Sequence, residues 1–154
     1  MAEEWQYAEL AGQEGMVVVV EGLDELLKAF AKYPKQSDKM LKETMIHALA
    51  VPQTRAKKAG YVPVDHGVLR SSIGADAGHV FGGKPAGGIL EAKKVGSEII
   101  GRLGSKVEYA PYQEYGTQYM VGRYYLTRAV KDTKDKMVKV FEKRIAKTLK
   151  KLGL

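Results

Sequence analysis

A long amphipathic pattern near the carboxyl end of the chain most constrains its fold. Between Tyr124 and Leu152, apolar residues recur at spacings of 4, 7, 4, 4, 4 and 3, and lysines cover the remaining face: Leu126, Val130, Met137, Phe141, Ile145, Leu149 and Leu152. Residues at such spacings share one face of an α-helix. The pattern therefore predicts one long helix with one face in the core.

Directly before this helix lies a stretch rich in tyrosine. Residues 109–129 read YAPYQEYGTQYMVGRYYLTRA and contain six of the nine tyrosines: Tyr109, Tyr112, Tyr115, Tyr119, Tyr124 and Tyr125. Tyrosine suits a position where one end of the side chain is buried and the other is hydrated, so the stretch predicts a contact surface. Gly116 can adopt a positive φ and predicts a turn between the two aromatic runs.

The remaining elements are shorter. The β-branched run Met16–Val20 is typical of a buried strand. Helical periodicity covers residues 24–33 and 37–59, and Pro52 predicts a kink or a short break in the second helix. Residues 94–107 predict one or two strands, antiparallel because no long helix separates them.

Together these elements predict an α+β fold: a small antiparallel β-sheet packed with two N-terminal helices and the long C-terminal amphipathic helix. With 154 residues the chain can bury one modest core. We expect a single structural domain over residues 16–154, with a flexible Gly-rich loop at 74–92. Residues 1–15 are expected to form an acidic N-terminal arm: an edge strand, a segment that becomes ordered on a partner, or a frayed terminus.

Charge is unevenly distributed along the chain. Residues 1–27 contain seven acids and no base, whereas residues 131–154 contain nine bases and three acids. Ends of opposite sign can pair within one chain or head to tail between copies, or they can be two solvated faces. The lysine face also suggests DNA binding. Interspersed acids and the lack of interleaved aromatics favour a solvated face or a protein partner instead.

Little in the sequence favours catalysis. The absence of cysteine excludes disulfides, thiolate catalysis and cysteine-based zinc sites, and the three histidines lack metal-ligand spacing. The segment GHVFGGK at 78–84 resembles a phosphate-binding loop, but Pro85 follows where a hydroxyl is needed. A hydrolytic set could be imagined from Asp65, His66, Ser71 and Ser72, but the sequence around them has no nucleophile elbow. No catalytic residue, cofactor or metal is predicted.

The sequence shows neither a secretory signal nor a membrane-spanning segment. No run of about 18 apolar residues predicts a membrane span, and Glu3 and Glu4 stand where a secretory signal would carry bases. We therefore expect the protein to remain in the cytoplasm where it is made.

One acid stands out within the tyrosine-rich stretch. Glu114 is the only acid between Tyr109 and Val130. A partly buried carboxylate needs a cationic or N–H partner. Arg70, which follows the Asp65-His66-Gly67 turn, carries a guanidinium that suits a carboxylate, so we predict that it pairs with Glu114.

Two motifs carry a family resemblance. They are Pro63-x-Asp65-x-Gly67-x-Leu69-Arg70-x-Ser72-Ile73 and Tyr109-Ala110-x-Tyr112-x-Glu114-x-Gly116-Thr117. Together with a preceding strand and GLDELL helix and a closing helix, the segment from about Val17 to Ala146 resembles the HK97 gp10-like proteins of long-tailed bacteriophages. These are small structural proteins from the head-to-tail joining and tail-completion gene cluster.

The resemblance implies a structural virion component without enzymatic activity. It implies that this chain is a neck protein that acts in head-tail joining or tail completion. Such a protein is expected to form a ring-like homo-oligomer around the tail axis and to contact connector, head-closure or tail-tube proteins. It is expected to reside in the virion after assembly in the host cytoplasm. The motif positions, with further tyrosines from the aromatic stretch, are Gly67, Leu69, Arg70, Tyr109, Tyr112, Glu114, Tyr115, Gly116, Thr117, Tyr124 and Tyr125. Arg123 departs from the family, which commonly has Pro there. A basic nucleic-acid-binding module is the alternative.

Overall fold

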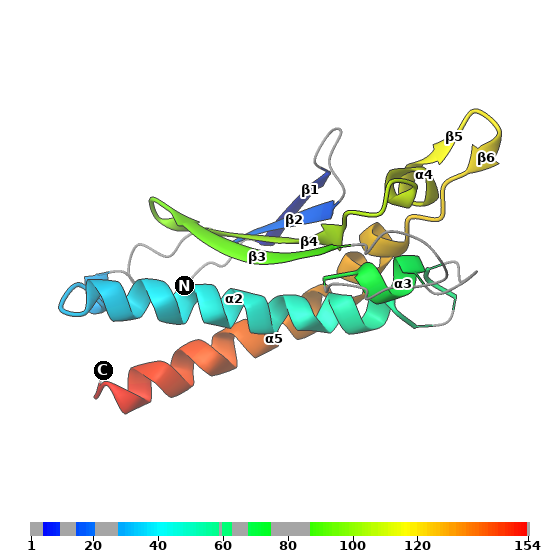
Figure 1. Ribbon diagram of the computed structural model, residues 1–154. Helices are drawn as coiled ribbons and strands as arrows, with labels where there is room; N and C mark the ends of the chain where they lie inside the picture. Colours follow the sequence, from blue (N-terminus) through cyan, green and yellow to red (C-terminus); the bar gives the residue numbers. More distant parts are fainter. Residues whose placement is uncertain are drawn as a thin grey trace.

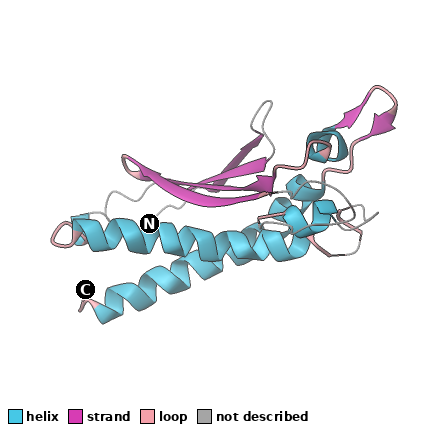
Figure 2. Cartoon of the chain, viewed as in Figure 1, coloured by secondary structure: helices cyan, strands magenta, loops and turns pink. Residues whose placement is uncertain are grey.

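A computed structural model describes residues 5–9, 15–20, 28–58, 60–62, 68–74 and 87–153. The strands and helices, in chain order, are β1 (Trp5–Glu9), β2 (Gly15–Val20), α2 (Pro34–Ala56), α3 (Val68–Ser72), β3 (Gly88–Val95), β4 (Glu98–Ser105), α4 (Ala110–Tyr115), β5 (Gly116–Thr117), β6 (Met120–Val121) and α5 (Tyr125–Lys151). Figures 1 and 2 show a curved sheet lying over two long helices, with α4 and the β5–β6 hairpin at one end. The expected α+β class is confirmed.

The main sheet has four strands in the order β1-β2-β4-β3, and every neighbouring pair is antiparallel, as expected. β1 occupies one edge, so part of the acidic N-terminal arm is an edge strand. β3 begins at Gly88, inside the range expected to be a flexible loop, so residues 88–92 correct that prediction. In this strand, Leu90 and Ala92 pack on the core while Glu91 and Lys93 are exposed. This alternation is typical of a strand, but the glycine-rich composition of the segment outweighed it in the prediction of a loop.

The two long helices form a layer beneath one face of the sheet. α2 and α5 lie side by side and run in opposite directions (Figure 1). Side chains from α2, β4 and α5 meet in a shared core, which includes Leu41, Met45, Leu49, Ile99, Leu103, Met137, Phe141 and Ile145. A Cβ at Gly101 would lie 2.8 Å from side-chain atoms of Met45 and Leu49, so glycine lets β4 approach α2 closely.

The long C-terminal helix is confirmed within a residue at each end. α2 starts earlier than expected, because Pro34 has no N–H to satisfy and suits the first helical turn. The expected break at Pro52 is absent, since α2 continues through it and packing along its length outweighs the lost hydrogen bond. Of the helix expected at 24–33, residues 24–27 lie outside the described chain, and Lys28 and Ala29 are helical.

Polar contacts tie the end of α2 to the start of α5. The Arg128 guanidinium donates to the carbonyl oxygens of Gly60 at 3.0 Å and Tyr61 at 3.1 Å, and lies 4.9 Å from the centroid of the Tyr61 ring. The Tyr61 hydroxyl donates to Asp132. These contacts fix the N-terminal part of α5, from which the aromatic end of the molecule extends. No helix in the described ranges has both the length and the apolar character needed to cross a membrane.

Candidate interaction surface

Exposed apolar side chains gather at one end of the molecule. They come from α4, the β5–β6 hairpin and the residue before α5, and we call them the tyrosine surface: Tyr109, Tyr112, Tyr119, Met120, Val121 and Tyr124. The hairpin projects beyond α4 and away from α2 and α5 (Figure 1). Exposed apolar patches of this kind mark protein contact sites, and aromatic residues and methionine are enriched at such interfaces.

Two glycines hold the hairpin at its base. Gly116 has φ +84°, which confirms the predicted positive φ, and a Cβ there would lie 2.5 Å from the backbone nitrogen of Gly122. A Cβ on Gly122 would in turn lie 2.5 Å from the carbonyl carbon of Tyr115. The two arms therefore approach so closely that only glycine fits at both positions. The short pairing of Gly116 with Val121 and of Thr117 with Met120 closes the hairpin.

The hairpin base is joined to α5 through Glu114, which is 3% exposed. Its carboxylate accepts hydrogen bonds from the backbone N–H groups of Leu126 at 2.9 Å and Thr127 at 3.0 Å, and from the Thr127 hydroxyl at 2.6 Å. The first N–H groups of a helix have no intrahelical partner, and a negative charge is favoured there. The Tyr124 N–H also donates to the Glu114 carbonyl oxygen at 3.0 Å. Glu114 thus caps α5 and fixes α4 against it.

The predicted pairing of Arg70 with Glu114 is wrong. Arg70 is exposed on α3, and among the described residues no ion pair joins it to Glu114. N–H groups at the start of α5 take the place that we had expected a guanidinium to take. Gly116 and Gly122 were the sequence signal for the true partners. A chain reversal between these two glycines brings Leu126 back next to Glu114.

The structure divides the other predicted positions between surface and core. Tyr109, Tyr112, Thr117 and Tyr124 are exposed, and Tyr115 is half-buried. Leu69 lies in the core. Gly67 lies outside the described residues. Sequence reasoning did not single out Met120 and Val121, which form β6 directly after the hairpin turn and are exposed.

Tyr125 differs from the other tyrosines, because it is only 1% exposed and is among the largest fully buried side chains. Burial raises the pKa of its phenol well above the ordinary value, and the nearby Glu114 carboxylate raises that pKa further. Tyr125 therefore supports the tyrosine surface from within the core and does not itself face a partner.

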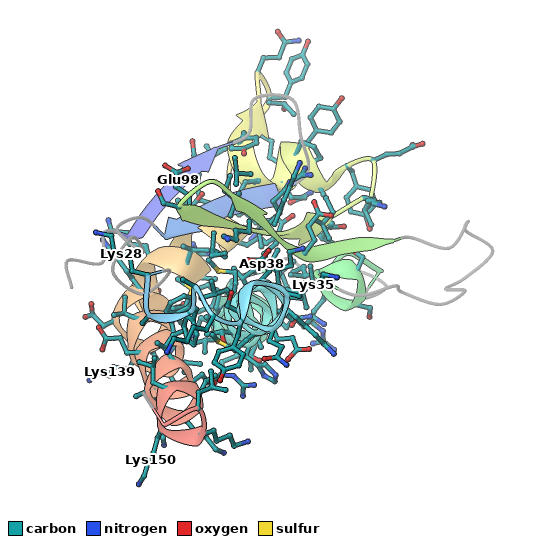
Figure 3. All side chains as sticks on the ribbon, turned by 90° about the vertical axis from the view of Figure 1, so that its left-hand side faces the viewer. Lys28, Lys35, Asp38, Glu98, Lys139 and Lys150 are labelled. Atoms are coloured by element: carbon teal, nitrogen blue, oxygen red, sulfur yellow. The ribbon has the colours of Figure 1, made fainter. Side chains whose placement is uncertain are left out.

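A second, basic region lies toward the opposite end. Figure 3 looks onto the end where α2 begins and α5 finishes, and the exposed Lys28, Lys35, Lys139 and Lys150 surround it. Lys94 donates to Asp38 at 2.7 Å nearby, which neutralises part of this charge. Within the described ranges, no group of three or more His, Cys, Asp or Glu side chains could hold a metal ion.

The fold and the exposed hairpin define a small α+β protein with an exposed apolar surface at one end. The model of the HK97-gp10-like family, described as "Bacteriophage HK97-gp10, putative tail-component", matches residues 24–116, more than half of the chain. The chain belongs to this family, and is thus a structural component of a bacteriophage virion. The matched range contains the first motif and all of the second except Thr117, and it ends at Gly116, so most of the hairpin and α5 follow it. No curated protein and no solved structure matches the chain.

Proposed function

We propose that this virion protein acts in head-tail joining or tail completion, as a neck component. It multimerises in a ring around the tail axis and contacts connector, head-closure or tail-tube proteins. The observation that carries this proposal is the tyrosine surface, an apolar end that a glycine-based hairpin and a buried carboxylate hold in place.

The composition of the tyrosine surface supports a protein partner. Tyr109, Tyr112 and Tyr124 combine a large apolar ring with a hydroxyl that tolerates water, which suits a surface that is exposed before assembly and covered after it. Because the Glu114 cap ties α4 to α5, these rings need little ordering when a partner binds. We propose that the protein works through such contacts and not as an enzyme.

The proposal is tested by replacing three tyrosines of this surface, Tyr109→Ser, Tyr112→Ser and Tyr124→Ser, in a phage whose own copy of the gene is interrupted. We expect the variant to fold as the parent does, and electron microscopy of lysates to show filled heads separated from tails or tails with abnormal ends. Tyr33→Ser is the matched control, because Tyr33 is also exposed but lies before α2. Normal virions at the parental titre from the triple variant would refute the proposal.

The basic region supports a second candidate, a nucleic-acid-binding module. Lysines on one surface neutralise phosphates and give affinity that falls steeply with salt. We place this function second, because Asp132, Asp135 and Glu142 interrupt the lysines of α5.

A further inference from the structure

A groove opens between α2 and α5. It has a volume of about 240 Å³ and is lined by Ala50, Val51, Thr54, Arg55, Lys58, Thr133 and Lys136. The hydroxyls of Thr54 and Thr133 donate to backbone carbonyl oxygens of their own helices, at 2.9 and 2.6 Å. The lining therefore combines two apolar side chains, Ala50 and Val51, with two threonines whose hydrogens are already engaged.

Three cations also line the groove. Arg55 is half-buried, and Lys58 and Lys136 are exposed. Among the described residues, none of the three forms an ion pair with an acid. The groove therefore combines apolar side chains with positive charge, and this combination suits an aromatic ring, since a cation is attracted to the face of the ring. The stacking of Arg128 on Tyr61 shows this contact within the same chain.

The tip of the β5–β6 hairpin is the most exposed apolar feature of the described chain. Tyr119 is 90% exposed and Val121 87%. The Tyr119 N–H donates to the Thr117 hydroxyl at 3.2 Å, so the turn that presents the ring is itself hydrogen-bonded. The hairpin points away from both long helices (Figure 1), so the groove of its own chain is out of its reach.

We propose that the hairpin tip of one copy, led by the ring of Tyr119, docks in the α2–α5 groove of a second copy. The sizes agree, because an apolar cavity of about 150 Å³ already holds a benzene ring, and this groove is larger. Arg55, Lys58 and Lys136 then surround the ring. Two different surfaces meet in this contact, so it is heterologous and closes into a ring or extends into a filament. The inference rests on the proposed function and names the contact that would build its multimer.

Cross-linking between single cysteines tests the contact directly, because the chain has no cysteine of its own. Tyr119→Cys and Thr54→Cys are purified separately, one with a size tag, and then mixed and oxidised. We expect a mixed disulfide dimer on a non-reducing gel, since the two positions face each other across the contact. The matched control pairs Tyr119→Cys with Thr148→Cys, which lies on α5 well beyond the groove and should give only background.

A second measurement uses light scattering at increasing protein concentration. Tyr119→Ser should weaken self-association at least tenfold, whereas Tyr33→Ser should not change it. Thr54→Trp, which fills the groove, should weaken it as much as Tyr119→Ser does.

Each contrary outcome has a distinct meaning. A multimeric parent without a mixed cross-link overturns the docking and leaves the proposed function standing. Dominant dimers between two Tyr119→Cys chains would indicate a symmetric tip-to-tip contact and also overturn it. Protection of Thr54→Cys from alkylation by a DNA duplex, but not by a second copy, would assign the groove to phosphate. A parent that stays monomeric would overturn both the docking and the proposed ring.

Discussion

At the scale of single residues, Glu114 joins α4 to the start of α5. Its carboxylate is buried, and its partners among the described residues are donors at the start of α5. Without this carboxylate, the N–H and O–H donors at the start of α5 would be left unsatisfied, which costs free energy. The identity of residue 114 therefore decides whether α4 and α5 stay together.

We predict that Glu114→Ala lowers the free energy of unfolding by about 2–3 kcal/mol, because it removes a cap and leaves buried donors without partners. Urea unfolding followed by circular dichroism measures the change. Glu108→Ala serves as the control, since Glu108 is exposed and its loss should cost less than about 0.5 kcal/mol. Arg70→Ala should behave like the control. An effect of Arg70→Ala as large as that of Glu114→Ala would restore the ion pair that the structure rejects.

Tyr125 gives a prediction for alkaline pH. An unfolded tyrosine ionises near pH 10, but burial raises the pKa of Tyr125 in the folded chain. Above about pH 10 the unfolded state therefore binds fewer protons than the folded state, and stability falls as pH rises. Tyr125→Phe removes this contribution, so the stability of the parent relative to the variant should decline between pH 9 and pH 11.

Thermal unfolding of both proteins across that pH range measures the difference. Lysines titrate in the same interval, but they do so in both proteins and cancel in the comparison. Tyr112→Phe is the control, because Tyr112 is exposed. A parent and Tyr125→Phe pair whose difference stays constant with pH would contradict the raised pKa.

At the scale of elements, the periodic segments could be predicted and the contacts between segments could not. The apolar spacing of residues 126–152 fixes a helix whatever lies beside it, and α5 follows the prediction closely. The partner of Glu114, in contrast, depends on how tightly the chain reverses at Gly116 and Gly122. The local sequence pattern does not say how close Glu114 comes to residues beyond the hairpin. The groove between α2 and α5 was invisible for the same reason, since its lining comes from two helices about 80 residues apart.

The hairpin gives a prediction at this scale. Gly116→Ala should lower the free energy of unfolding more than Gly60→Ala does, although both glycines have a positive φ. A positive φ strains an alanine by about 1–3 kcal/mol, and Gly116, with ψ −178°, lies in a region that is essentially limited to glycine. Only the alanine at 116 also meets backbone atoms, whereas nothing lies within 4 Å of a Cβ at Gly60. Denaturant unfolding of the two variants measures the excess, and equal losses would show that the hairpin base is looser than described.

At the scale of the whole molecule, apolar and basic character lie toward opposite ends. The tyrosine surface extends from the start of α5, and the lysines in Figure 3 surround the end where α5 finishes. The sequence already indicated the charge asymmetry and the tyrosine cluster. It could not show where the tyrosines of α4 and the hairpin would lie, because their position at the start of α5 depends on the contacts of Glu114 with Leu126 and Thr127.

This separation lets the two candidate functions be tested apart. We predict that Lys147→Glu with Lys150→Glu leaves virion assembly and titre unchanged, because these exposed lysines lie far along α5 from the tyrosine surface. The same variant should weaken any binding to a DNA duplex in a mobility-shift assay at low salt, because it removes two positive charges and adds two negative ones. A defective virion from the lysine variant, together with a normal one from the tyrosine variant, would favour the nucleic-acid-binding module.

The Glu114 cap has a mechanical consequence for an assembling subunit. α5 has 27 residues, and at about 1.5 Å per residue a helix of that length spans about 40 Å. The carboxylate ties the hairpin base to the first turn of this helix, and buried side chains from Leu126 to Ile145 pack the helix into the core. The hairpin and the lysine-bearing end are therefore held at a fixed separation of about the length of α5, so a partner at one end and a partner at the other would be kept at that spacing.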